Sequence, residues 1–430
     1  MPGHGHELTR LRIALTAFFA LDGFVFAGWV VRIPAVKERT GASAGALGLA
    51  LLGVSAGAVV TMTLTGRLCR RYGDHRVTVV CAVLLCLSVA LPPLTRSVLA
   101  LGAVLLVFGM AYGGINVAFN SAAVAVVAAL RRPVMPSFHA AFSLGGMAGA
   151  GLGGLVAGAF SPAVHLSGLA VIGLLVTLVA GRVLLRHRPP AAPDDTPPPV
   201  GGAAADDTPP PVGGAAREDA APPVGGAAAD DTPPSGVDRR SRRLVVTFGL
   251  IALGTAYGEG ALADWSALHL EQDLGAAPGL AAAGYTCFAL AMAVGRLSGT
   301  RLLERLGRTR TLVWGGATAA AGMLVASLVP SVWAALAGFV VTGLGLANLF
   351  PVAIERAGRL AGAGGVALAS TLGYGGMLLG PPAIGFMAEW FSLPVALTSV
   401  AVLAATAAVV ALTARGGLTS AHKAGSRPRG

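Results

Sequence analysis

The sequence predicts an all-α membrane protein with twelve transmembrane helices in two pseudo-symmetric six-helix bundles. Of its 430 residues, 54% are hydrophobic and only 12% are charged, and the mean hydropathy is +0.72. Water-soluble globular proteins do not have this composition. Apolar stretches of about 20 residues, long enough to cross a bilayer, recur along the chain. A polar segment near residue 200 divides them into six before it and six after it.

The apolar stretches are separated by short polar loops. Those of the first half cover residues 11–33, 45–66, 77–95, 98–128, 137–160 and 165–185. Those of the second half cover residues 244–270, 276–300, 311–329, 331–355, 363–388 and 393–414. The 61 glycines support this interpretation, because small residues let helices approach closely in lipid. The first stretch is too long for a signal peptide, so we expect it to be retained.

Four regions follow from this pattern. They are an N-terminal bundle over residues 1–188, a linker over 189–243, a C-terminal bundle over 244–414 and a basic tail over 415–430. The linker is rich in Pro, Gly, Ala and Asp, and a twelve-residue repeat begins at Asp194, Asp206, Glu218 and Asp230. Because such units have almost nothing to bury, we predict a disordered tether rather than a docking motif.

The net charge of +11 reflects topology rather than a nucleic-acid partner. Of the 31 Lys and Arg residues, 27 fall on the side of the termini and the linker. The other four are Arg32, Lys37, Arg39 and Arg96. The positive-inside rule therefore predicts a multi-pass protein of the plasma (inner) membrane with both termini in the cytoplasm. The four cysteines have no metal-binding spacing, and no phosphate-binding G-x-x-x-x-G-K-[ST] loop is present.

The loops after the second and eighth stretches repeat one pattern. The first is GRLCRRYGDHR, and the second is TRLLERLGRTR. Alignment of Gly73 with Gly307 also pairs one leucine and two arginines. At these residues the chain resembles the major facilitator superfamily, whose signature here is G-x-L-x-D-[RK]-x-G-[RK]-[RK]. The resemblance implies the two-bundle MFS fold, a substrate site lined by the first, fourth, seventh and tenth spans, and a latch formed by these loops.

The chain departs from the signature at Arg70, where the family has an acid. We therefore expect Glu304, with its basic neighbours, to serve as the latch of the second half. The residues expected to gate this face are Gly66, Arg71, Gly73, Arg76, Glu304, Arg305, Gly307, Arg308 and Glu355. The segments EGALADWSA and ANLFPVAIERAGR are similar to bacterial single-chain members near the sugar/proton symporter branch.

Two acids, each followed by glycine, lie within apolar stretches. Asp22 is near the middle of the first stretch and Glu259 near the middle of the seventh. An ionisable group at bilayer depth costs roughly 2.5 to 3.5 kcal/mol on insertion scales, so it is seldom kept without a partner or a task. We expect both to bind a coupling proton, the alternative being a structural hydrogen bond. Asp264 is a third candidate, although it projects about 140° from Glu259 on an ideal helix and also fits an interfacial position.

A second set of residues is predicted to contact substrate. Tyr112, Asn116 and Asn120 recur every four residues and form one polar stripe on an apolar helix. Amides offer donors and acceptors that suit hydroxyl or amide groups, the alternative being hydrogen bonds between helices. The remaining candidates are the tryptophans that follow the acids and the amide in the tenth stretch, namely Trp29, Trp265 and Asn348.

The predicted function is secondary active transport of a small molecule by alternating access, coupled to protons by symport or antiport. The alternatives are an uncoupled facilitator, a polytopic membrane enzyme and a sensor that does not transport. His139 and Ser143 share a helix face, but no third catalytic partner accompanies them, so we expect no catalytic residue. We also expect no metal or cofactor, no nucleic-acid partner and a monomer whose partners are substrate, protons and lipid.

Overall fold

The computed structural model describes residues 2–130, 134–187 and 239–425, and these residues are almost entirely helical. The first half contains α1 (Pro2–Val30), α2 (Ile33–Thr40), α3 (Ala44–Tyr72), α4 (Asp74–Val89), η1 (Pro92–Leu94), α5 (Val98–Leu130), α6 (Met135–Val156) and α7 (Pro162–Arg186). The second half contains α8 (Arg239–Leu268), η2 (His269–Asp273), α9 (Pro278–Ala281), α10 (Ala283–Leu297), α11 (Gly299–Leu306), α12 (Arg308–Leu328), α13 (Val332–Leu346), α14 (Leu349–Trp390) and α15 (Leu393–Gly425).

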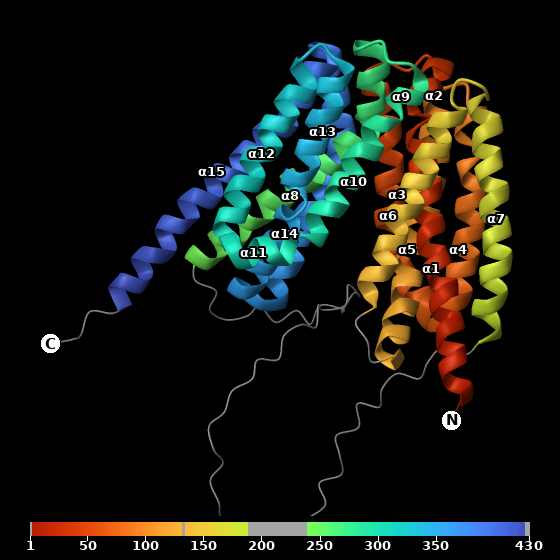
Figure 1. Ribbon diagram of the computed structural model, residues 1–430, viewed down its shortest axis with the longest axis horizontal. Helices are drawn as coiled ribbons and strands as arrows, with labels where there is room; N and C mark the ends of the chain where they lie inside the picture. Colours follow the sequence, from red (N-terminus) through yellow and green to blue (C-terminus); the bar gives the residue numbers. More distant parts are fainter. Residues whose placement is uncertain (1, 131–133, 188–238, 426–430) are drawn as a thin grey trace, which may run out of the picture.

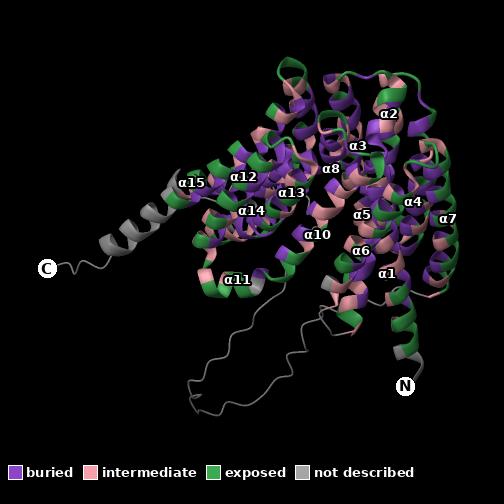
Figure 2. Ribbon diagram, turned by 45° about the horizontal axis from the view of Figure 1, so that its top comes forward, coloured by how far each residue is buried: buried purple, intermediate pink, exposed green. Residues whose placement is uncertain are grey.

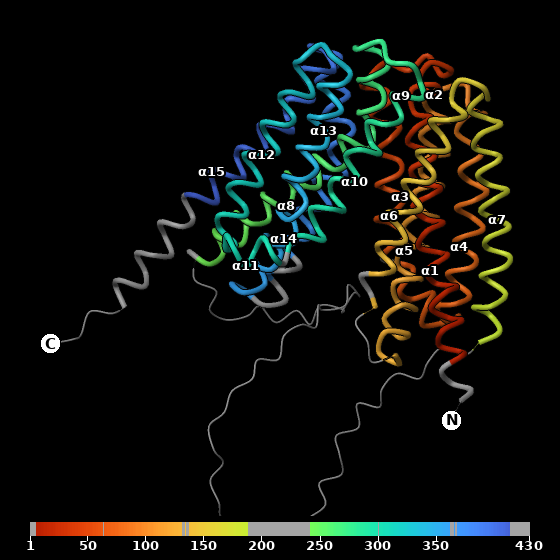
Figure 3. Tube along the Cα trace, viewed as in Figure 1, coloured from red at the N-terminus to blue at the C-terminus, as the bar shows by residue number. Residues whose placement is uncertain are grey.

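The helices form two bundles, one from each half of the chain, as the separate warm and cool colours of Figure 3 show. In the first bundle α1 packs on α6, α3 on α5, and α4 on α7. The second bundle repeats these pairs as α8 on α14, α10 on α13, and α12 on α15. The two halves therefore share one packing plan, as the sequence predicts.

Close glycine contacts confirm the repeat at the level of single residues. A Cβ atom added at Gly109 would overlap the carbonyl oxygen of Val54, and one added at Gly343 would lie 2.7 Å from that of Phe288. Each residue of the second pair lies 234 positions after its counterpart, from 54 to 288 and from 109 to 343. Helix pairs at such short separation depend on glycine, because any side chain would push the backbones apart.

Ten helical stretches among the described residues are long and apolar enough to cross a membrane. The two predicted spans outside this set lie in α6 and in the second part of α14, both of which are rich in glycine. Glycine lowers the hydropathy of these helices without lowering their tendency to pack. The outward side of α7 is largely exposed, as Figure 2 shows, and its exposed residues include Val171, Leu175 and Val179. Such apolar exposure is expected where lipid is the solvent.

The structure differs from the predicted boundaries in the tenth and eleventh spans. The tenth is divided between α13 and α14 at Ala347 and Asn348, and no loop separates it from the eleventh, because α14 continues to Trp390. A straight helix of this length would be about 63 Å long, twice the thickness of the hydrocarbon core. Instead the chain turns back, since a Cβ atom at Gly365 would overlap the carbonyl oxygen of Ala357, only eight residues earlier.

The predicted linker and tail are also partly corrected. Helix α8 begins at Arg239, so residues 239–243 are helical, and α15 extends the last span into the predicted tail as far as Gly425. The rest of the linker, with its twelve-residue repeats, lies outside the described residues. Both termini lie at the same end of the molecule, where the ribbons of the two bundles diverge (Figure 1). We call this the termini side and the opposite end the far side.

Contacts between the bundles gather at the far side. The Lys37 ammonium donates to the Gln272 side chain at 3.2 Å, and the backbone N–H of Gly45 donates to the Glu389 carboxylate at 3.0 Å. Near the same end, the backbones of Gly154 and Gly279 approach so closely that a Cβ atom on either would lie within 3.0 Å of the other's carbonyl oxygen. The bundles are therefore closed against each other on the far side.

Candidate functional site

Asp22 is the most deeply buried acid of the site. It lies on α1 with no exposed surface, and one carboxylate oxygen accepts a hydrogen bond from the Asn116 amide on α5 at 3.4 Å. The other oxygen is buried without a hydrogen-bond partner, and no cation pairs with the carboxylate among the described residues. A low-dielectric site of this kind disfavours a charged carboxylate and favours the neutral acid.

The glycine beside Asp22 has a packing role. A Cβ atom at Gly23 would overlap the carbonyl oxygen of Phe142 on α6. Glycine therefore allows α1 and α6 to cross at the depth of the acid. The acid-glycine pair combines a buried carboxyl group with the helix contact that seals it.

The polar stripe of α5 is directed toward Asp22. Asn116 contacts the acid, and the Asn120 amide donates to the Asn116 backbone carbonyl at 2.7 Å. Tyr112 stacks on Phe26 of α1, with 5.1 Å between the ring centroids. The predicted common face is therefore present, and one of its members serves the acid directly.

Glu259 has a different environment from Asp22. Its carboxylate accepts from the Arg296 guanidinium of α10 at 2.8 Å, and the two side chains are 34% and 49% exposed. A Cβ atom at Gly260 would lie 3.9 Å from Met377, so the second acid-glycine pair is loosely packed. Arg296 was not predicted as a site residue, because its charge was counted only toward the topological bias. Its position inside the predicted span 276–300, in the half that carries Glu259, was the signal that could have identified it.

Asp264 lies one turn and a half beyond Glu259 on α8 and makes no hydrogen bond or ion pair within the described part of the chain. Tyr285 of α10 is within electrostatic range of both acids. The Phe26 ring of α1 lies 6.4 Å from the Tyr285 ring, edge on. Because Phe26 also stacks on Tyr112, three aromatic rings form a row from α5 through α1 to α10. This row joins the two halves near the acids, and no sequence pattern predicted it.

The predicted substrate contacts of the two tryptophans are not supported by their positions. Trp29 and Trp265 are 1% and 0% exposed and belong to the hydrophobic core. The Trp29 ring packs 6.4 Å from that of Phe108, within its own half. A side chain with no free surface offers no contact to a ligand in this conformation.

Asn348 is also engaged by the protein. Its amide donates to the Gly295 carbonyl at 2.9 Å, and its side chain is 7% exposed. Asn348 lies at the break between α13 and α14. Its hydrogen bond holds the backbone of α10 at Gly295, the residue before Arg296. This is the hydrogen bond between helices that we gave as the alternative to substrate binding.

The two repeated loops on the termini side have the same backbone and different pairs. Gly73 and Gly307 have φ angles of +87° and +74°, a region that favours glycine. After Gly73, the Asp74 carboxylate accepts from Ser121 at 2.8 Å. After Gly307, Arg308 pairs with Glu355 at 2.7 Å. Both pairs are 47 residues apart, and each member of the second lies 234 positions after its counterpart.

The remaining gating candidates make few contacts. Arg308 pairs with Glu355, not with Glu304 as expected, because Glu355 lies on the facing helix α14. Arg359 also donates to Glu355, at 2.6 Å. Arg71 covers the Tyr72 ring at 5.3 Å, and a Cβ atom at Gly66 would lie 3.9 Å from the Arg70 guanidinium, an ordinary contact. The side chains of Arg76, Glu304 and Arg305 are exposed.

The architecture agrees with the comparisons to known proteins. The family model of the Major Facilitator Superfamily matches this chain over residues 13–224 and 248–429. The chain belongs to this superfamily. An uncharacterized MFS-type transporter of Yersinia pestis is 33% identical over 95% of this chain and 96% of its own length. An uncharacterized transporter of Sinorhizobium fredii is 32% identical over 92% and 96%.

The fold likeness extends to solved structures. A bacterial homolog of the human lysosomal transporter Spinster, in an inward-facing and occupied conformation, matches with a TM-score of 0.71 at 14% identity. The match covers 96% of this chain and 97% of that one. This MFS protein is therefore a multi-pass membrane transporter of a small molecule, and the enzyme alternative is excluded by its family.

Proposed function

We propose that this MFS transporter couples the movement of a small molecule to protons through Asp22, by alternating access at a site between the two bundles. The observation that carries the proposal is the burial of Asp22 with one unpartnered oxygen and no cation among the described residues. Such a carboxyl group gains and loses a proton only when the conformation changes its access to water. Loading and unloading of that kind is what coupling requires.

The proposed site lies between Asp22 on one bundle and the Glu259–Arg296 pair on the other. Glu259 and Arg296 lie on helices that form part of the second bundle, yet both keep substantial exposed surface. A polar substrate group can compete for either member of the pair. Asn120 and the Tyr112–Phe26–Tyr285 row supply polar and aromatic contacts from the first bundle and the seam. Together they suit a ligand with hydrogen-bonding groups on an apolar or planar frame.

The proposed orientation places the termini side in the cytoplasm of a bacterial inner membrane. The support is the bias of 27 basic residues against four. The closed far side then faces outward, and the side on which the ribbons of the two bundles diverge faces the cytoplasm (Figure 1). Symport and antiport use the same loading step, so the geometry favours neither.

The experiment begins with a ligand screen by thermal stabilisation of the purified protein. Uptake of each hit is then measured in proteoliposomes under a pH gradient, with and without a proton ionophore. We expect wild-type protein to accumulate ligand only while the gradient persists, and Asp22→Asn to abolish accumulation while retaining ligand binding. Glu38→Gln, which removes an exposed carboxylate, is the matched control and should behave as wild type. Ionophore-sensitive accumulation by Asp22→Asn would contradict the proposal.

A second candidate is an uncoupled facilitator, which the Glu259–Arg296 ion pair favours because a paired carboxylate has no need of a proton. In that case both the wild type and Asp22→Asn equilibrate ligand without accumulating it. The same flux assay therefore separates the two candidates.

A further inference from the structure

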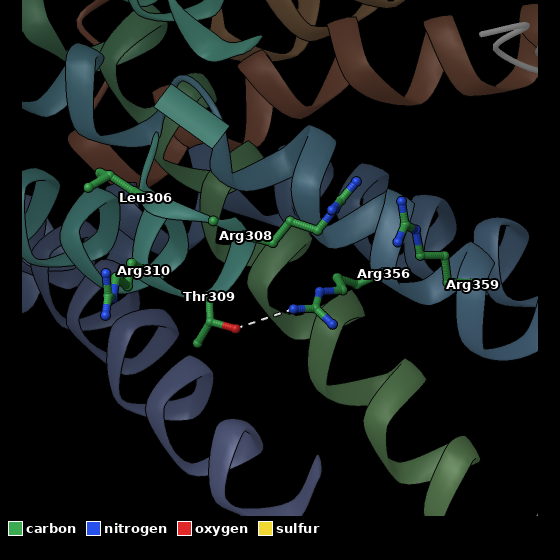
Figure 4. Close-up of a pocket in the computed structure, with 7 residues that line it drawn as sticks. Leu306, Arg308, Thr309, Arg310, Arg356 and Arg359 are labelled. Carbon is green, nitrogen blue, oxygen red and sulfur yellow. Dashed lines mark hydrogen bonds between the residues drawn. The ribbon is translucent and has the colours of Figure 1, made fainter. Parts of the chain in front are cut away.

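The termini side of the second bundle has a cavity of about 340 Å³ that is lined by arginine. It lies between the turn that joins α11 to α12 and the facing stretch of α14. The residues that line it include Gly307, Arg308, Thr309, Arg310, Arg356 and Arg359. In Figure 4, Arg356 reaches from α14 to the Thr309 hydroxyl, a hydrogen bond of 3.2 Å that joins the two walls.

The positive charge of this cavity is largely uncompensated. Glu355 accepts from Arg308 and from Arg359, so one carboxylate serves two guanidinium groups. Among the described residues, Arg356 has only the neutral Thr309 hydroxyl as a hydrogen-bond partner, and its Nε atom is buried without one. Arg310 is exposed and makes no hydrogen bond or ion pair with any residue that is described. In the part of the chain that the structure describes, four arginines thus face one acid, an excess of three positive charges.

Backbone donors add to this excess. Helix α12 begins at Arg308, so the N–H groups of its first turn have no acceptor within the helix. These donors and the positive end of the helix dipole lie in the wall of the cavity. Guanidinium groups and backbone N–H groups together are the donors that phosphate oxygens prefer in proteins.

The first bundle provides an internal comparison. With the offset of 234 residues, Asp74 stands at the place of Arg308, and Ala122 and Ala125 stand at the places of Arg356 and Arg359. Only Arg76, the counterpart of Arg310, keeps its charge. The shared backbone plan therefore does not by itself require the arginines. Because these arginines occur in the second half alone, we infer that they have a function specific to that half.

We propose that this arginine cavity binds a phosphate-bearing anion on the termini side of the membrane. Arg308 is the first residue of one candidate membrane span, and Arg359 lies two residues before the end of another. This depth is shared by lipid headgroups and by soluble compounds of the adjoining aqueous phase. An anion here binds both α12 and α14, and it thereby holds together the two walls that Arg356 and Thr309 already join.

The test uses the full-length protein in phosphatidylcholine nanodiscs. One arm titrates inorganic phosphate against chloride at matched ionic strength, and the other replaces part of the lipid by phosphatidylglycerol. The melting temperature and the phosphatidylglycerol retained in native mass spectrometry are the readouts. We expect at least one probe to stabilise the wild type. Stabilisation by phosphate alone assigns the site to soluble compounds, and stabilisation by phosphatidylglycerol alone assigns it to lipid headgroups.

The decisive variant is Arg310→Gln with Arg356→Gln, which leaves the Glu355 ion pairs intact. We expect it to weaken binding of the effective probe by about fivefold for each arginine removed. The matched control is Arg67→Gln with Arg70→Gln, which removes two exposed arginines on the same side of the first bundle and should leave binding unchanged. If the double variant fails to fold, Arg310→Gln alone replaces it, since Arg310 makes no contact that folding needs. Equal loss in both double variants, or no effect of either probe on the wild type, overturns the proposal.

Discussion

The two halves place an acid-glycine pair on corresponding helices, α1 and α8, and surround it differently. In the first half Asp22 is sealed by the α1–α6 contact, and the Asn116 amide is its only hydrogen-bond partner among the described residues. In the second half Glu259 is partly exposed and paired with Arg296. The same contrast recurs on the termini side, where Asp74 meets Ser121 and Arg308 meets Glu355. At these matched positions, one backbone plan thus carries acids without a cation in the first half and the ion pairs of Glu259 and Glu355 in the second.

This difference indicates that the two halves have different functions in transport. A carboxyl group without a cation responds to protons, because burial disfavours its charge. A carboxylate with a guanidinium partner stays charged and responds instead to groups that compete for the partner. Duplication supplies two similar bundles, and substitution at a few positions gives each a separate task. The predictions below test this contrast between the halves.

The largest expected effect concerns helix packing where α1 crosses α6 and where α8 crosses α14. A Cβ atom at Gly149 would overlap the carbonyl oxygen of Phe24, whereas one at Gly380 would lie 3.5 Å from Tyr257, an ordinary contact. Gly149→Ala should therefore cost about 1 to 3 kcal/mol of stability through overpacking. Gly380→Ala should be tolerated. Thermal unfolding of the two purified variants checks this, and equal losses would show that the contact at Gly149 is not tighter than the contact at Gly380.

The next effect concerns the ion pair of the second half. Glu259→Gln leaves the Arg296 guanidinium without its carboxylate, so we expect the initial rate of uptake to fall about tenfold, which corresponds to roughly 1.4 kcal/mol. Glu259→Gln combined with Arg296→Gln should recover part of this loss, because no unpaired charge remains. Proteoliposome uptake gives the rates. Additive losses in the double variant would mean that the pair does not act as a unit.

The smallest effect concerns the gate. Glu355→Gln removes a partly exposed acceptor of two arginines and should cost less than about 1 kcal/mol. The cost should shrink further at high salt, which screens exposed charges. Ser121→Ala, at the equivalent position, removes a bond with a neutral donor and should depend little on salt. Melting temperatures at low and high salt distinguish the two, and a salt-independent loss in Glu355→Gln would count against an ionic latch.

The fold could be predicted because its signals are local and repeated. Apolar length, the central polar segment and the paired Gly73 and Gly307 loops each follow from short stretches of sequence. The reversal near residues 357–365 agrees with the predicted boundary between the spans 331–355 and 363–388. The break at Ala347 and the continuation of helical structure through the reversal could not be predicted in this way. Glycine-rich helices have no sharp change in composition where they bend, so their boundaries depend on tertiary packing.

The site was predictable only in part, because its contacts between helices depend on tertiary packing. Charge at bilayer depth identified Asp22 and Glu259, since lipid makes it costly. Helical spacing identified the α5 stripe that reaches Asp22. Spacing along one helix does not show which helix lies opposite, however, so it missed Arg296 and the Phe26–Tyr285 contact. It also assigned Trp29 and Trp265 to substrate although both are buried in the core.

Proton binding by Asp22 is the central claim, and infrared difference spectroscopy tests it without knowledge of the substrate. Spectra of the full-length protein in lipid are recorded between acidic and alkaline pH for the wild type, Asp22→Asn and Glu38→Gln. We predict a protonated-carboxyl band that disappears with rising pH in the wild type and in Glu38→Gln, and that is missing from Asp22→Asn. A carboxyl spectrum unchanged by Asp22→Asn would contradict the assignment of Asp22 as the coupling acid.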